Sequence, residues 1–326
     1  MLLSAAFAQD AVSLQVVRNA QLGSGLPRLT VIANADTTRL AVDLRCGATD
    51  ASAEGAPKAG GRLDVDIPLS APGPATCAGE LAVALADGSE GTMPLQFDVN
   101  LLAPIEITVA RDAVDIDART LSLATSRPAN ITVTASGLDG ELGQGSFGGA
   151  PAGEPVTLSW QQPDGAEVVR LHVRAEDGDG FWSALDLFPW FYAIPHEDVV
   201  FASNQSDVRD SEARKLTDAM TEISGVTAKY GQHAEVNLYV AGYTDSVGAA
   251  GANKALSERR ARAIAAWFRA AGFSGTIYYQ GFGEAGLLVP SGDEVDEPRN
   301  RRAAYIVAAE APPESPQMPG SRWTKL

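Results

Sequence analysis

The sequence is poor in histidine and cysteine and contains no long apolar run. Its three histidines, His172, His196 and His233, lie far apart, which argues against a histidine-rich zinc site and a Ser-His-Asp hydrolase. Basic residues number 25 against 41 acidic ones, so the net charge is −16. Such a chain repels phosphate backbones, and we expect no nucleic-acid partner. No segment reaches the about 20 apolar residues of a membrane-spanning helix, so we expect no direct membrane span.

The composition is nevertheless that of a folded chain. Hydrophobic residues make up 45% and charged residues 20% of the 326 positions, which is enough apolar material for a core. At about 150 residues per domain, the length predicts about two domains. The 32 glycines and 19 prolines indicate many turns, as in β-rich domains.

The N-terminal segment and the two cysteines indicate export. Residues 6–8 (AFA) precede Gln9 as at a signal-peptidase site, although no basic segment comes before them and the apolar stretch is short. We interpret residues 1–9 as the remnant of a signal peptide; the alternative is an ordinary apolar N-terminus. Cys46 and Cys77 both lie in the first third of the chain. Two thiols alone cannot complete a tetrahedral metal shell, so we expect a disulfide between them.

Short segments of alternating apolar and polar residues follow one another through residues 10–195. Their spacing predicts two immunoglobulin-like β-sandwiches, at 10–102 and 103–195, with the glycine-rich residues 143–153 as a loop. The expected strands are residues 12–20, 29–35, 40–46, 63–69, 80–86, 95–102, 105–109, 121–123, 131–133 and 168–173. Aromatic residues gather at 181–192, and we interpret them as core and as packing against the next domain; an exposed platform for sugars is the alternative.

The pattern changes at about residue 196, where helical periodicity begins. Residues 199–201 (VVF) predict a short strand, and apolar residues at steps of three and four between 213 and 230 predict a helix. A strand at 236–240, a helix at about 253–271 and strands at 276–279 and 303–307 follow. The order β-α-β-α-β-β predicts an α+β domain at 196–310, and residues 311–326 read as a flexible tail.

The second of these helices carries an arginine on its apolar face. Placing Leu256 at zero and advancing about 100° per residue puts the apolar side chains within an arc of about 140°, and Arg260 falls inside it at about 40°. A guanidinium on a packed face needs an anionic or hydrogen-bonding partner. The nearest candidate is Asp245, in the loop before the helix. One interpretation is a closed Asp245–Arg260 ion pair. The alternative is that the two charges are held apart to receive a zwitterion, with an ammonium on Asp245 and a carboxylate on Arg260.

Four motifs in this region occur in order. They are GYTDSVG at 242–248, NKALSERRA at 253–261, GFGE at 281–284 and NRRA at 300–303. Together they resemble the OmpA C-terminal-like family, whose pattern is a G-H/Y-T-D-x-x-G loop, an N-x-x-L-S-x-x-R-A helix start, a G-x-G-E turn and a closing N-R-R-V. The resemblance covers about 199–309 and includes FASN at 201–204. Tyr243 and Ala303 depart from the usual His and Val. The three-part arrangement resembles OmpA-family proteins of some Gram-negative bacteria.

The resemblance implies non-covalent binding of the meso-diaminopimelate in the peptidoglycan stem peptide. By position it assigns the ligand contacts to Asp245 and Arg260, with Thr244 beside them. The residues expected to support the loops are Gly242, Gly248, Asn253, Asn300, Arg301 and Asn204. Among these, Gly242 and Gly248 would allow a tight turn, and Arg301, like Arg302, is expected to be solvated; a position near the glycan is the alternative.

The family implies a non-enzymatic protein of the periplasm that binds the cell wall; any association with the outer membrane would be indirect, through partners. We expect no metal and no cofactor. The sandwiches at 10–196 would then act as spacers or bind an envelope protein. The alternative is a subunit of a larger envelope assembly, in which the sandwiches bind a protein partner and the wall contact is a tether. An enzyme acting on peptidoglycan is disfavoured because the recognised segment holds no acid pair or Cys/His pair with a motif behind it.

Overall fold

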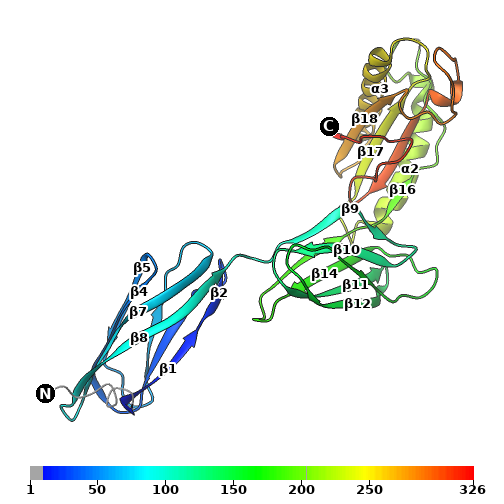
Figure 1. The fold of residues 1–326 in the computed structure, drawn as a ribbon. Coiled ribbons are helices and arrows are strands. Elements are labelled where there is room, and N and C mark those ends of the chain that lie inside the picture. Colours follow the sequence, from blue (N-terminus) through cyan, green and yellow to red (C-terminus); the bar gives the residue numbers. More distant parts are fainter. Residues whose placement is uncertain (1–9, 203) are drawn as a thin grey trace. The chain divides into compact units, whose positions relative to one another are not determined.

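The computed structural model describes residues 10–326 except Ser203, so the expected signal-peptide remnant at 1–9 lies outside the described residues. The described chain is mostly β-structure with a few helices, and it divides into two compact units. The first unit contains the residues up to Glu106 together with Glu176–Ser183, and the second contains Ile107–Ala175 and Ala184–Leu326. Figure 1 shows the course of the chain within each unit.

The first unit contains two β-sheets that share one apolar core. Strands β1 (Val12–Val17), β3 (Arg28–Ala33) and β6 (Arg62–Asp66) form the smaller sheet, in the order β1-β3-β6. The larger sheet, β2-β8-β7-β4-β5, contains β2 (Asn19–Gln21), β4 (Thr37–Cys46), β5 (Thr49–Gly55), β7 (Gly73–Leu85) and β8 (Glu90–Leu102). Leu29 and Val31 from one sheet and Leu40 and Leu81 from the other are fully buried in the same cluster. Along these strands, inward apolar side chains alternate with outward polar ones, and the inward side chains pack the two sheets together, as the sequence predicts.

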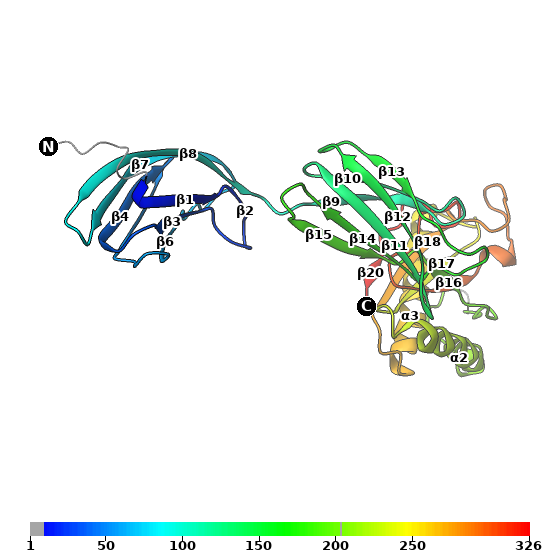
Figure 2. The same ribbon diagram turned by 90° about the horizontal axis from the view of Figure 1, so that it is seen from below.

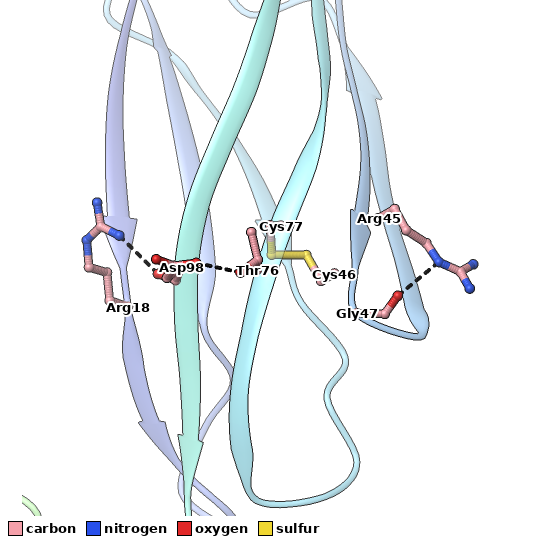
Figure 3. The surroundings of a disulfide bond; sticks show 7 residues. All are labelled: Arg18, Arg45, Cys46, Gly47, Thr76, Cys77 and Asp98. Atoms are coloured by element: carbon pink, nitrogen blue, oxygen red, sulfur yellow. Dashed lines mark hydrogen bonds between the residues drawn. A yellow bond between two sulfur atoms is a disulfide. The ribbon is translucent and has the colours of Figure 1, made fainter.

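A disulfide joins Cys46 and Cys77, as the sequence predicts. Strands β4 and β7 are antiparallel, and their register places the two cysteines directly opposite each other, with Cα atoms 4.0 Å apart. Both residues are fully buried. Figure 3 shows the bond connecting neighbouring strands, with Thr76 donating to Asp98 on the next strand. The disulfide therefore joins two inner strands of the larger sheet, β4 and β7.

The second unit begins with two further sheets. One has the order β13-β10-β9 and the other β12-β11-β14-β15. The strands are β9 (Ile107–Asp115), β10 (Thr120–Thr125), β11 (Ala129–Gly137), β12 (Gly140–Ala150), β13 (Val156–Ser159), β14 (Arg170–Glu176) and β15 (Trp182–Leu187). Inward residues of both sheets, such as Leu121 and Ile131, are fully buried. That this sandwich and the first one are immunoglobulin-like stays a prediction.

The prediction of a loop at residues 143–153 is wrong for most of that segment. Strand β12 pairs with β11 from Gly140 to Ala150. A Cβ on Gly143 would lie 1.8 Å from the carbonyl oxygen of Gln161, and one on Gly145 would lie 1.9 Å from that of Ser159. These glycines allow a close approach of neighbouring backbone and do not mark a turn.

The C-terminal part of the second unit is a five-stranded sheet with the order β16-β19-β17-β18-β20. Its strands are β16 (Phe191–Ala193), β17 (Asn237–Tyr243), β18 (Ile277–Gly283), β19 (Ala303–Ala308) and β20 (Thr324–Lys325), and the helices are α2 (Ala213–Tyr230) and α3 (Ala250–Ala270). The predicted strand at 199–201 is wrong, because β16 takes the edge position beside β19. The remaining order, α2, β17, α3, β18 and β19, agrees with the sequence prediction.

The two faces of this sheet are covered differently. Leu238 and Val240 of β17 point into the core that α2 and α3 cover, whereas Tyr239 and Ala241 point to the opposite face. Figure 2 shows both helices on one side of the sheet. Strand alternation thus gives the sheet two apolar faces, and both need a cover.

The C-terminal segment covers the second face, so the prediction of a flexible tail is wrong. The Trp323 ring packs edge-on against Tyr239 and Phe282, with ring centroids 5.1 and 5.9 Å apart. Strand β20 pairs with β18, and the Arg322 amide donates to Gln280 Oε1 at 2.6 Å. The composition of residues 312–326 hides this because few apolar side chains carry the packing.

The aromatic segment near residue 190 is divided between packing and exposure. Trp190 is buried and stacks on Tyr230 of α2, with ring centroids 4.2 Å apart. Tyr230 also donates a hydrogen bond to Glu167 of the preceding sandwich. Phe191 and Tyr192 stay 54% and 42% exposed. The interpretation as packing against the next domain therefore holds for Trp190 and the partly buried Phe188, and not for Phe191 and Tyr192.

Candidate functional site

The candidate site lies at the end of β17, where the chain enters the loop before α3. Strands β17 and β18 are parallel and α3 connects them, so the loops that follow both strands meet at one edge of the sheet. Gly248 has a φ of 93°, which fits the expected tight turn. Gly242 has a different role from the expected one: it lies inside β17, and a Cβ there would be 2.4 Å from the carbonyl oxygen of Ser257. Its lack of a side chain lets α3 approach the strand.

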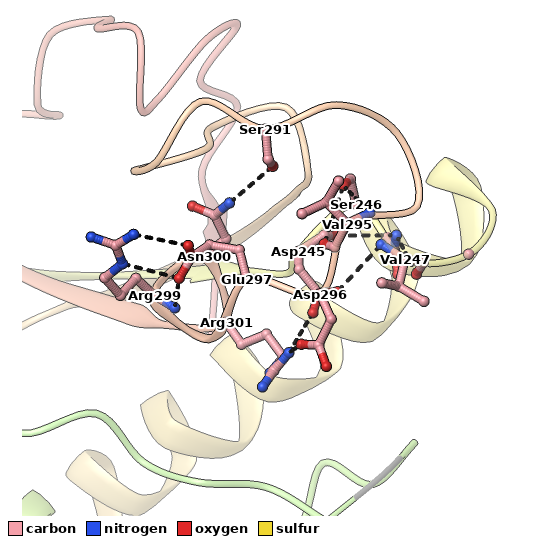
Figure 4. Close-up of polar contacts among 12 residues, drawn as sticks. Asp245, Ser246, Val247, Ser291, Val295, Asp296, Glu297, Arg299, Asn300 and Arg301 are labelled. Atoms are coloured by element: carbon pink, nitrogen blue, oxygen red, sulfur yellow. Dashed lines mark hydrogen bonds and ion pairs between the residues drawn. The ribbon is translucent and has the colours of Figure 1, made fainter.

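Asp245 is buried and paired with an arginine from the end of the domain. Its Oδ2 accepts a hydrogen bond from Arg301 Nη1 at 2.6 Å, and its side chain is only 11% exposed. Arg301 also binds Asp296, so one guanidinium is shared by two carboxylates (Figure 4). These hydrogen bonds, first Asp245 and then Asp296, raise the pKa of Arg301. Arg301 is also 40% exposed, as expected for a solvated side chain, but the loop brings two anions to it, which the sequence did not predict.

Arg260 is half buried and does not bind Asp245. Its Nε donates to the carbonyl oxygen of Gln205 at 3.1 Å, and its guanidinium lies 5.0 Å from the centre of the Phe201 ring. Burial lowers the pKa of Arg260, Arg301 lowers it further, and Asp245 opposes the shift. The closed Asp245–Arg260 ion pair is thus absent. The alternative, in which Asp245 and Arg260 are held apart to receive a zwitterion, requires a free carboxylate on Asp245. In this structure Arg301 is bound to that carboxylate.

A cavity of about 210 Å³ lies beside the arginines, and Asp245 is not among its lining residues. Arg260 and Arg301 line it together with the half-buried Arg302, and Asp198 is the acidic residue among its lining residues. Phe201 and Ile264 are among the apolar residues that line it. Guanidinium groups that converge on a small, partly apolar cavity suit a carboxylate, since their planar N–H groups match its two oxygens.

Thr244 cannot reach a ligand as its surroundings stand. Its amide donates to the carbonyl oxygen of Gly283 at 3.0 Å, and its hydroxyl is buried without a hydrogen-bond partner among the described residues. A buried hydroxyl without a partner costs free energy. The contact expected of Thr244 therefore stays a prediction that needs a movement of the loop.

Two asparagines hold the loops around the site. Asn253 Nδ2 donates to Glu284 Oε2 at 2.7 Å and to the carbonyl oxygen of Val247 at 3.2 Å. Asn300 is fully buried; its Oδ1 accepts from the Val289 amide and its Nδ2 donates to the Val289 carbonyl oxygen. This geometry is that of the supporting role expected for both. Asn204 is exposed with a φ of 58°, and its neighbour Ser203 in the FASN segment lies outside the described residues.

Sequence reasoning missed the serines that connect these loops. Ser246 Oγ donates to the carbonyl oxygen of Gly292 at 2.6 Å and accepts from the Val295 amide at 3.2 Å. Ser257 Oγ accepts from the Gly283 amide at 2.9 Å. Ser257 lies on the buried face of α3. A polar residue on that face could have indicated, from the sequence, that its hydroxyl bonds to another part of the domain. The loop after β18 is thus tied to the loop after β17.

Arg302 also differs from expectation. Its guanidinium lies 3.8 Å from the centre of the Tyr243 ring, and Nη2 donates to the carbonyl oxygen of Gly286 at 2.9 Å. The expectation that it is solvated is wrong, because the ring and the loop enclose it. Burial lowers the pKa of Arg302 and raises that of Tyr243 to about 12. The pair forms one wall of the cavity.

Comparison with known proteins agrees with the resemblance seen in the motifs. Residues 200–301 match the model of the OmpA family. This segment contains the loop after β17, helix α3 and the residues up to Arg301. This part of the chain is therefore an OmpA family domain.

A curated relative matches 70 residues of the chain. The outer-membrane lipoprotein YfiB of Pseudomonas aeruginosa is 41% identical over 70 residues, which are 21% of this chain and 42% of the relative. The match thus spans less than half of that protein's length.

Solved structures give weaker likenesses. The OmpA-like domain of FopA1 from Francisella tularensis has 20% sequence identity, a TM-score of 0.27 and coverage of 43% of this chain and 75% of its own. A putative MotB-like protein from Desulfovibrio vulgaris has 18% identity, a TM-score of 0.26 and coverage of 44% and 77%. Among the described residues, no helix has both the length and the apolar character to cross a membrane.

Proposed function

We propose that the C-terminal domain binds peptidoglycan without covalent chemistry, through the meso-diaminopimelate of the stem peptide. The observation that carries the proposal is that Arg260 and Arg301 line one cavity, and that Arg301 is paired with the buried carboxylate of Asp245. The match to the OmpA family supports it, because these residues lie in that family's motifs. The diaminopimelate head group offers a carboxylate and an ammonium on one carbon, and the site offers charges of both signs.

The ligand carboxylate would bind Arg260. The present acceptors of this guanidinium are backbone carbonyl oxygens of Gln205 and Ala202, at 3.1 and 3.4 Å. A carboxylate is a stronger acceptor, since hydrogen bonds between ions are about twice as strong as neutral ones. Burial lowers the pKa of Arg260, which means that this arginine lacks a full anionic partner and gains from one.

The ligand ammonium would bind Asp245 after Arg301 has moved. Arg301 contacts Asp245 and Asp296 at once, and its side chain is 40% exposed. Asp296 can therefore keep Arg301 when the ammonium takes its place on Asp245. With about 1.5–3 kcal/mol for each charged hydrogen bond, a few such bonds suffice for micromolar affinity.

The corresponding role in the cell is attachment to the wall. We place the protein in the cell envelope and more narrowly in the periplasm, as the OmpA family domain and the relative named as an outer-membrane lipoprotein support. The function is binding and not catalysis. The second candidate is a subunit of a larger envelope assembly for which the wall contact is a tether; the groove described below favours a protein partner.

Co-sedimentation with purified sacculi tests the proposal. Arg260→Ala and Asp245→Ala should each lower the bound fraction at least tenfold, and free meso-diaminopimelate should compete with the unaltered protein. Arg259→Ala is the matched control, because it removes an exposed arginine from the same helix. Equal binding of the Arg260 and Arg259 variants would overturn the proposal.

Sacculi with lysine in place of diaminopimelate give a second test. Lysine lacks the carboxylate on the carbon that bears the terminal ammonium, so binding should weaken about as much as in Arg260→Ala. The Arg260 variant should then show no difference between the two kinds of sacculi. A preference that survives in this variant would place the carboxylate elsewhere.

A further inference from the structure

A larger cavity, of about 650 Å³, lies between the second sandwich and the C-terminal sheet, within the second unit. Val109 and Val114 of β9 line one side, and Phe188 and Phe191 line another. Pro312, at the start of the C-terminal segment, also lines it. Phe191 is 54% exposed, and Val109, Val114 and Phe188 are half buried. The cavity is therefore an apolar groove that solvent reaches.

Both strands beside the groove are edge strands. Strand β9 is the last strand of the order β13-β10-β9, and β16 is the first of the order β16-β19-β17-β18-β20. The register of β9 with β10 shifts between Leu121 and Leu123, and Ala110 and Asp112 of this irregular stretch line the groove. An edge strand offers backbone N–H and C=O groups to another extended chain.

Among the described residues that line the groove, the charge is of one sign. Asp112 and Glu310 are the ionisable side chains among its described lining residues, and both are exposed. Glu310 Oε1 accepts a hydrogen bond from the Phe188 amide at 3.2 Å, which holds this carboxylate at the groove. Two carboxylates beside apolar walls favour a cationic and partly apolar occupant.

We propose that this groove binds an extended peptide segment of another envelope protein, with alternating basic and apolar side chains, as an added strand on β9. The backbone of the peptide pairs with the edge of β9 and its apolar side chains contact Val114 and Phe191. Its basic side chains meet Asp112 and Glu310. The site is separate from the peptidoglycan site: the two cavities have no lining residue in common.

A glycan fits the groove less well. Sugar recognition needs many polar side chains for the hydroxyl groups, and apart from the two carboxylates the lining consists of apolar residues. Trp190, the largest ring of the groove, is buried and already stacked on Tyr230. A peptide supplies its own backbone hydrogen bonds and needs only apolar pockets for its side chains.

Synthetic octapeptides test the proposal on the full chain. We expect acetyl-(Lys-Val)4-amide to shift the amide NMR signals of Ala110, Val114 and Phe191, and (Glu-Val)4 and (Lys-Ser)4 to bind at least tenfold more weakly. A (Lys-Val)4 peptide that is N-methylated at the valines should also lose at least tenfold, because it cannot donate to β9. Equal binding of the methylated peptide would overturn strand addition, and no binding by (Lys-Val)4 would overturn the proposal.

Variants locate the site and separate its charge from its shape. Val114→Arg should abolish binding, whereas Leu288→Arg, a change at an exposed apolar residue that does not line the groove, should leave it unchanged. The double variant Asp112→Asn and Glu310→Gln should bind (Lys-Val)4 about tenfold more weakly, and the control pair Asp139→Asn and Glu222→Gln, with the same charge change, should not. Shifts of the same amides by soluble peptidoglycan fragments, or by the protein's own dimerisation, would overturn the assignment to a peptide.

Discussion

The first sandwich and the OmpA family domain are stabilised in different ways. The sandwich has an apolar core between its two sheets and one covalent cross-link, Cys46–Cys77. The C-terminal domain instead buries polar side chains at one edge of its sheet. These are Thr244, Asp245, Ser246, Asn253, Ser257 and Asn300. Gln21 and Thr37 are the corresponding buried polar residues of the described sandwich.

The buried polar side chains of the C-terminal domain lie where the positions of the loops matter for function. A buried polar group costs free energy unless it is hydrogen-bonded, so a cluster of such groups is retained where the position of a loop must be defined. Asn253 and Asn300 define the loops that carry Asp245 and Arg301. The sandwich needs only a stable frame, and apolar alternation with one disulfide provides it. Each region should therefore respond to a different kind of substitution.

Loss of the disulfide should have the largest effect on stability. The cysteines are 31 residues apart, and removing a cross-link of this loop length costs about 3.5 kcal/mol. Cys46→Ala with Cys77→Ala should lower the free energy of unfolding of the first unit by about this amount, measured by urea unfolding under oxidising conditions. The binding of sacculi should not change. A parallel loss of sacculus binding would show that the two regions are not independent.

A side chain at Gly281 should have the next largest effect, in the C-terminal domain alone. A Cβ there would lie 2.2 Å from the amide nitrogen of Glu258, so α3 would have to move away from β18. We expect Gly281→Ala to cost about 3 kcal/mol, as overpacking does, and to lower sacculus binding because α3 carries Arg260. Gly225→Ala is the control, because the Cβ meets nothing within 4 Å in α2 and should stabilise the helix by about 1 kcal/mol. Equal effects of the two variants would refute the close-approach argument.

Removal of the Asn300 amide should have a smaller effect on stability and a distinct effect on the loop. Asn300→Ala leaves the amide and carbonyl groups of Val289 without their partner, at about 2 kcal/mol. Hydrogen exchange should increase in residues 284–297. Asn300→Asp keeps the acceptor for the Val289 amide but buries a carboxylate against the Val289 carbonyl oxygen, so it should cost at least as much. If exchange increases equally in both variants, the donor and not the acceptor holds the loop.

The sequence predicted the elements whose side chains are periodic, and the domain motifs predicted the candidate site. Helices α2 and α3 and strands β17, β18 and β19 follow from the spacing of their apolar residues. Strand β12 was missed because its glycines serve close packing, and the C-terminal segment because only two of its apolar side chains, Met318 and Trp323, are among those that pack on the described face of the sheet.

The partner of Asp245 could not be predicted from the sequence. Arg301 is 56 residues away, and its side chain reaches Asp245 only because β19 and β17 are neighbours in the sheet. A helical wheel identifies Arg260 as unusual, but it does not show that backbone carbonyl oxygens satisfy it. Such contacts depend on loop conformation, which residue periodicity does not describe.

The smallest expected effect is a loss of folding stability at alkaline pH, and it comes from Tyr243, which lines the cavity of the candidate site. Burial raises the pKa of Tyr243 to about 12, from about 10 in the unfolded chain. A raised pKa stabilises the folded protein fully below pH 10, and this contribution is lost as the pH rises from 10 to 12, because the unfolded chain releases its proton first. At pH 11 the loss is about 1.4 kcal/mol.

Tyr243→Phe isolates this contribution. The variant keeps the ring that stacks on Phe282 and lies under Arg302, but it cannot ionise. Burial also raises the pKa of Tyr305, which is present in both proteins and cancels in their comparison. Between pH 9 and pH 11 the unaltered protein should therefore lose about 1.4 kcal/mol more than Tyr243→Phe in urea unfolding. An equal loss in both proteins would mean that Tyr243 ionises in the folded state as easily as in the unfolded chain, and that the loop does not shield its ring from water.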